Sequence, residues 1–156
     1  MFDQHLTVVP IILPLIAAPI TFILGRSILS WGFATLISAV ACFLSWQLLD
    51  AALANGVLSY AVGGWQPPWG IELRVDAANA FVLLVVSAMS TLVLIYSKDS
   101  IEKEISAPNQ NLYYTAHLLC LAGLTGILLT GDAFNLFVFL EISSLATYTL
   151  VSLSSD

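Results

Sequence analysis

Long runs of apolar residues, separated by short polar stretches, dominate the chain. Five of these runs approach the roughly 20 residues of helix that cross about 30 Å of hydrocarbon. We therefore predict about five membrane-spanning helices, at residues 6–24, 28–49, 77–96, 113–130 and 133–152. Pro10, Pro14 and Pro19 lie in the first run, and we expect that helix to be kinked.

The polar stretches between the runs predict how the helices are connected. Residues 25–27 and 131–132 are so short that the helices on either side must form antiparallel hairpins. The connection at residues 97–111 contains Lys98 and Lys103 among acidic residues, and we expect a short polar helix or turn there.

The connection between the second and third runs predicts a different structure. Residues 71–75 alternate apolar with polar side chains, as a half-buried strand does, and residues 57–62 form a second strand-like segment. A Gly-, Pro- and Trp-rich turn separates them. We predict a small β-hairpin over the helix ends, with Trp65 and Trp69 at the level of the lipid headgroups.

Composition supports the same fold class. Of the 156 residues, 59% are hydrophobic and 9% are charged, whereas a soluble domain has about 25% charged residues. The prediction is an all-α, polytopic transmembrane helix bundle, with residues 1–156 as one transmembrane domain in a lipid bilayer. A soluble enzyme is excluded. The net charge of −6 argues against a nucleic-acid partner.

Basic residues predict the orientation of the bundle. With five crossings, Arg26, Lys98 and Lys103 share one side of the membrane and Arg74 lies on the other. Lys and Arg concentrate on the cytoplasmic side. The bias predicts a multi-pass protein of the cell membrane with its N-terminus outside and its C-terminus in the cytoplasm.

Glu141 is the outstanding candidate for function. It follows the start of the fifth predicted helix by eight residues, which places it about 12 Å deep, near the middle of the membrane. A lone carboxylate there costs roughly 2.5–3.5 kcal/mol on insertion scales, and such residues usually face a cavity or a partner. Ser144 and Tyr148, followed by Ser152, share its side of the helix.

This polar stripe has two interpretations. A carboxyl group at mid-membrane depth, with hydroxyls beside it, is suited to relaying protons or cations. Alternatively, a protonated Glu141 forms an interhelical hydrogen bond that only holds helices together.

His117 is a second candidate. It lies about one turn inside the fourth predicted helix with Tyr113 four residues before it, where an imidazole can accept an entering proton. The alternative is an interfacial histidine packed beside aromatic rings. Asp76 and Asp132 directly precede helices, and we predict that they are N-caps.

Other kinds of chemistry have no signature in the sequence. There is no His and Cys cluster for a metal, no Gly-rich phosphate loop and no catalytic triad pattern, so we expect no metal, no cofactor and no catalytic residue. Cys42 and Cys120 lie inside apolar runs and predict no disulfide framework. Gly123 and Gly126 permit close packing of the fourth helix against a neighbour.

Two motifs carry a family resemblance. Residues 131–141 read Gly-Asp-Ala-Phe-Asn-Leu-Phe-Val-Phe-Leu-Glu, and residues 63–76 read Gly-Gly-Trp-Gln-Pro-Pro-Trp-Gly-Ile-Glu-Leu-Arg-Val-Asp. In combination they resemble the antiporter-like subunits of Mrp-type multisubunit cation/proton antiporters, those of the D type in particular. The same family supplies the proton-pumping membrane subunits of respiratory complex I and of membrane-bound hydrogenases.

The resemblance implies a share in moving protons or sodium ions. Glu141 matches the family's fifth-helix glutamate, which in that family pairs with a lysine two helices further on. Lys98 and Lys103 lie outside the predicted crossings, and the chain resembles only the N-terminal third of such a subunit. The expected partners are therefore other membrane subunits, along with protons and monovalent cations.

The resemblance leaves three functions open. The first is a subunit, or a fragment of one, of a Na⁺/H⁺ antiporter complex, with no enzymatic activity of its own. The second is a proton-pumping membrane subunit of an NADH:quinone oxidoreductase or hydrogenase, in which other chains carry the redox chemistry. The third is a truncated, inactive fragment.

Overall fold

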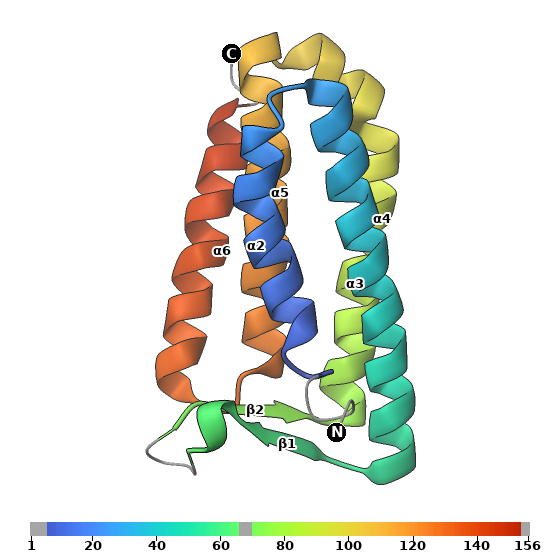
Figure 1. Ribbon diagram of the computed structural model, residues 1–156, viewed down its shortest axis with the longest axis vertical. Coiled ribbons are helices and arrows are strands. Elements are labelled where there is room, and N and C mark those ends of the chain that lie inside the picture. Colours follow the sequence, from blue (N-terminus) through green and yellow to red (C-terminus); the bar gives the residue numbers. More distant parts are fainter. Residues whose placement is uncertain (1–5, 66–69, 154–156) are drawn as a thin grey trace.

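The computed structural model describes residues 6–65 and 70–153, which form an up-and-down bundle with a small sheet at one end (Figure 1). The elements in chain order are α2 (Val9–Ile23), α3 (Ser27–Asn55), β1 (Leu58–Ala61), the short 3-10 helix η1 (Val62–Gly64), β2 (Glu72–Val75), α4 (Ala77–Glu104), α5 (Ala107–Leu129) and α6 (Ala133–Leu153). The five helices and the hairpin between the second and third confirm the predicted fold class.

Four of the described helices, α3 to α6, are long and apolar enough to cross a membrane. The first helix, α2, is also apolar but has 15 residues. It begins at Val9, not at residue 6 as predicted, and Pro10 lies in its first turn, where a missing N–H donor costs nothing. The chain is a multi-pass membrane protein, and its first and last described residues lie at opposite ends of the bundle (Figure 1).

The prediction of a separate short polar helix or turn at residues 97–111 is wrong. Helix α4 continues through both lysines to Glu104, and Ile105 and Ser106 alone separate it from α5. Residues 97–106 contain neither Gly nor Pro, and Lys and Glu favour helix. Their polarity marks where the chain leaves the hydrocarbon and not where the helix ends. Similarly, α3 continues past its predicted end at residue 49 to Asn55.

The hairpin is attached to the ends of the helices. Its strands are antiparallel, with Leu58 opposite Val75. Val75 is completely buried and Leu73 nearly so, and the N–H of Gly131 donates to the carbonyl of Glu72 at 2.8 Å. The sheet is therefore fixed to the α5–α6 connection, as Figure 1 shows.

The predicted position of the hairpin's tryptophans is only partly testable. Trp65 is 69% exposed, as a side chain that reaches the lipid headgroups has to be. Trp69 lies outside the described residues.

Both predicted N-caps are confirmed. Asp76 accepts hydrogen bonds from the N–H groups of Ala78 and Asn79 at 2.9 Å, and the Asn79 side chain accepts from the N–H of Asp76 at 2.8 Å, which completes a capping box. Asp132 accepts from the N–H groups of Phe134 and Asn135 at 3.3 and 3.4 Å.

Helix α5 is the centre of the bundle and α6 lies at its edge. Helix α5 contacts α2, α3, α4 and α6, and half of its membrane-length segment is buried, compared with 17% for α6. The contact between α5 and α6 is close, because a Cβ atom on Gly123 would lie 2.7 Å from the backbone nitrogen of Ser143. This confirms the close packing predicted from Gly123 and Gly126.

Candidate functional site

Glu141 lies on the outer face of α6. It follows Ala133, the first residue of the helix, by eight positions, or about 12 Å along the axis. The residues that α6 buries are Asn135, Ser143, Ala146 and Leu153, and Glu141 is on the opposite side, exposed. The carboxyl group therefore points away from the other four helices.

The neighbours of Glu141 on this face are mostly apolar, and most of them are exposed. Phe137, one turn before, is 61% exposed, and Leu145, one turn after, is 60% exposed. Tyr148 is 70% exposed, while Ser144 is half-buried at the border of the face. A carboxyl group and a phenol thus share an apolar surface of membrane-spanning length.

No basic residue accompanies Glu141 within the described residues. The four Lys and Arg residues of the chain are all described. Arg26 precedes α3, Arg74 lies in β2, and Lys98 and Lys103 occupy the last two turns of α4. The bundle alone therefore supplies no positive charge at the depth of the carboxylate.

His117 lies farther along its helix than the sequence indicated. Since α5 begins at Ala107 and not at residue 113, the imidazole is about 15 Å from the start of the helix. Its Nε2 atom is 2.9 Å from the hydroxyl of Ser90 in α4, and its ring stacks on Tyr113 with centroids 6.4 Å apart. The structure does not bring His117 and Glu141 together, because His117 faces α4 and Glu141 faces outward.

A network of hydroxyl groups beside His117 was not predicted. Ser38 in α3 donates to Ser90 at 2.9 Å, and Thr91 donates to Ser38 at 3.1 Å. Further along the same interface, Ser87 donates to Ser45 at 3.2 Å. The sequence contains the signal, because Ser87, Ser90 and Thr91 are spaced at three and four residues on one helix face.

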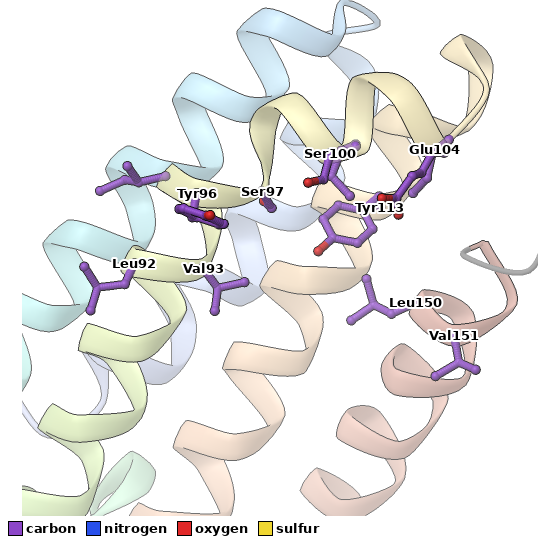
Figure 2. Close-up of a pocket in the computed structure, with 12 residues that line it drawn as sticks. Leu92, Val93, Tyr96, Ser97, Ser100, Glu104, Tyr113, Leu150 and Val151 are labelled. Carbon is purple, nitrogen blue, oxygen red and sulfur yellow. The ribbon is translucent and has the colours of Figure 1, made fainter.

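A groove opens between α4, the start of α5 and the end of α6 (Figure 2). Its volume is about 850 Å³, and most of its lining is apolar, including Leu92, Val93 and Leu150. Ser100, Glu104 and Tyr113 gather at one end of it (Figure 2). A smaller cavity of about 320 Å³ between α4 and α5 is lined by His117 and Ser90.

Metal-binding geometry is not found in the described part of the chain, where no three His, Cys, Asp or Glu side chains come together.

Comparison with known proteins identifies relatives along nearly the whole chain. No protein-family model matches. The D-type subunit of a Na⁺/H⁺ antiporter from Bacillus subtilis is 30% identical over 151 residues, which is 96% of this chain and 30% of the relative. The N-type subunit of the NADH-quinone oxidoreductase from Desulforudis audaxviator is 36% identical over 152 residues, which is 95% of this chain and 30% of the relative.

A solved structure agrees with these relatives. A chain of the membrane-bound sulfane sulfur reductase, an archaeal respiratory membrane complex, superposes with a TM-score of 0.86 and 29% identity, over 97% of this chain and 31% of that one. The chain thus spans about 30% of the length of the relatives that it matches. Along nearly its whole length, this chain is homologous to part of the D-type subunits of Na⁺/H⁺ antiporters and of the N-type subunits of NADH-quinone oxidoreductases.

Proposed function

We propose that this chain is part of a multisubunit Na⁺/H⁺ antiporter and takes part in moving protons or monovalent cations across the membrane. The observation that carries the proposal is Glu141, an exposed carboxyl group about 12 Å along a membrane-spanning helix. In the membrane, such a group is expensive unless a cavity or an opposite charge accompanies it. An outward-facing carboxylate therefore calls for a further polar surface that packs against α6.

The partners follow from the same surface. Because no basic residue of this chain lies at the depth of Glu141, we assign the opposing charge to helices that are not part of this sequence. Their expected feature is a lysine on an apolar helix, as the family resemblance implies. Tyr148 and Ser144 border the carboxyl group on α6, where their hydroxyls can hold water or a cation beside it.

His117 has a separate role in this proposal. It lies at a cavity between α4 and α5, away from Glu141, and serves as a second proton acceptor about 15 Å along α5. The chain itself is a transporter subunit with no covalent chemistry of its own.

A second candidate is a proton-pumping membrane subunit of an NADH:quinone oxidoreductase. The 36% identity to an N-type subunit of such an enzyme favours it. Glu141 has the same role in proton or cation transfer in both candidate functions. The two differ in the source of energy, which is a cation gradient in the first and redox chemistry in partner chains in the second.

The two functions can be separated with vesicles that contain the complex purified through this chain. An antiporter should move protons when a sodium gradient is imposed, without NADH or quinone. An oxidoreductase subunit should copurify with iron–sulfur or flavin chains and move protons only when NADH and quinone are supplied. The antiporter proposal fails if a sodium or potassium gradient produces no proton flux.

Orientation in the membrane also belongs to the proposal. Arg26, Lys98 and Lys103 lie at one end of the bundle and Arg74 at the other, so we infer that the end with three basic residues is cytoplasmic. The C-terminal end of α6 lies at that same end (Figure 1), and we therefore infer a cytoplasmic C-terminus and an outside N-terminus.

Cysteine labelling tests this orientation. Because Gln66 and Ser154 lie outside the described residues, the test uses Asn55 and Ser106, which are exposed at opposite ends of the bundle. After the native Cys42 and Cys120 are changed to Ala, Asn55→Cys should react with an impermeant reagent from outside and Ser106→Cys from the cytoplasmic side. The reverse pattern would overturn the orientation, and labelling of both from one side would overturn the topology.

A further inference from the structure

His117 is the end of a chain of hydrogen bonds that crosses three helices. Its Nε2 atom lies 2.9 Å from the Ser90 hydroxyl in α4, and Ser90 lies 2.9 Å from the Ser38 hydroxyl in α3. Ser38 in turn lies 3.1 Å from the hydroxyl of Thr91, back in α4. All four side chains are at least half-buried.

The hydrogen bonds from Thr91 to His117 can run in either direction, because each hydroxyl both donates and accepts. When Nε2 carries no proton, Thr91 donates to Ser38, Ser38 to Ser90, and Ser90 to Nε2. When Nε2 carries a proton, every donor reverses. Thr91 then donates to the carbonyl oxygen of Ser87, which lies 2.9 Å away. Rotation of three hydroxyls is enough to pass from one state to the other.

The far end of this hydrogen-bond chain is a backbone carbonyl, so the chain does not conduct protons across the membrane. A backbone carbonyl accepts a hydrogen bond but neither releases a proton nor takes one up at physiological pH. Among the described residues, the hydrogen-bond chain therefore ends at Thr91, whose hydroxyl reaches that carbonyl, and offers no proton acceptor beyond it. What the arrangement can do is keep Nε2 hydrogen-bonded whether it is a donor or an acceptor.

We propose that Ser90, Ser38 and Thr91 are positioning residues for His117, a reversible hydroxyl chain that keeps Nε2 hydrogen-bonded both when it accepts from Ser90 and when it carries a proton. A neutral ring with its proton on Nδ1 accepts from Ser90 at Nε2; uptake of a second proton, at Nε2, gives an imidazolium whose Nε2–H donates to Ser90, and loss of that proton restores the first direction. The consequence for transport rests on the function proposed above for His117, whereas the hydrogen-bond chain itself does not.

Simple helix packing is the competing explanation, and the same interface provides its control. Ser45 and Ser87 also join α3 to α4 through a hydroxyl pair, and both are buried. Neither hydroxyl is bonded to His117 or Ser90 among the described residues. Loss of the Ser45 hydroxyl should therefore disturb packing as much as loss of Ser38, without disturbing the imidazole.

Nitrogen NMR of the full chain in lipid bilayers tests the proposal. The chain has two histidines, His5 and His117, so ¹⁵N-histidine labelling of a His5→Gln background reports on His117 alone. We expect a shift of the Nε2 resonance in Ser90→Ala, a smaller shift in Ser38→Ala, recovery in Ser90→Thr, and no shift in Ser45→Ala. An unmoved resonance in Ser90→Ala, or equal shifts in Ser38→Ala and Ser45→Ala, would overturn the proposal.

Proton flux through the assembled complex then separates the two claims. If the resonance shifts as expected and Ser90→Ala lowers flux while Ser45→Ala does not, the hydroxyl chain positions His117 for transport. If the resonance shifts but neither Ser90→Ala nor His117→Ala changes flux, the hydroxyl chain is established and the transport role proposed for His117 is wrong.

Discussion

Replacing Glu141 by Gln should lower cation-dependent proton flux about 100-fold, the scale lost when a proton-transfer group is removed. Glutamine keeps nearly the same shape and can still donate and accept hydrogen bonds. It cannot release or bind a proton. Because the side chain is exposed on the outer face of α6, the five-helix bundle should fold normally and the complex should still assemble.

A shorter carboxylate gives an intermediate result. Glu141→Asp keeps the ionisable group but withdraws it by one methylene, so we expect partial flux with a changed pH optimum. Asp50→Asn is the matched control, since Asp50 is an exposed carboxylate on α3, far from α6 in the sequence and outside the polar stripe. It should leave flux unchanged.

The measurement is proton flux in vesicles with equal amounts of each variant complex. Wild-type flux from Glu141→Gln would leave the carboxyl group as an interhelical hydrogen-bond partner and end the relay proposal. Loss of flux together with loss of assembly would also contradict it, because the residue would then act in packing.

The helices were predictable from the sequence, but several of their ends were not. Runs of apolar residues report where the chain lies in hydrocarbon, and all five runs are helices. Helix ends depend instead on propensity and breakers. Residues 97–104 are polar yet continue α4 to Glu104, and α5 begins at Ala107, beside Pro108, rather than where the apolar run starts.

Some features of the candidate site were also predictable from the sequence, and others were not. The depth of Glu141 follows from counting residues along one helix, and so does its alignment with Tyr148. Periodicity shows which residues share a face but not which face meets a neighbour. That Glu141 faces outward while Ser143 packs against Gly123 depends on the arrangement of α5 and α6, which no local pattern contains.

The contact between α5 and α6 gives the second large effect, on stability. Gly123→Ala should destabilise the bundle by about 1–3 kcal/mol, the range for overpacking a tight contact. The new Cβ would lie 2.7 Å from the backbone nitrogen of Ser143 and 2.9 Å from its Cα. Backbone cannot rotate away as a side chain can, so α6 would have to move as a whole.

Two comparisons isolate this effect when unfolding is measured in detergent micelles. A Cβ on Gly32, in α3, meets nothing within 4 Å, so Gly32→Ala should be neutral or stabilising, as alanine is in an open helix. A Cβ on Gly126 meets the ring of Phe139, a side chain that can be shortened. Phe139→Ala, which removes every ring atom that the new Cβ would meet, should therefore partly rescue Gly126→Ala, whereas no side-chain change at Ser143 should rescue Gly123→Ala. Equal stabilities of Gly32→Ala and Gly123→Ala would show that α5 and α6 do not approach as closely as this structure has them.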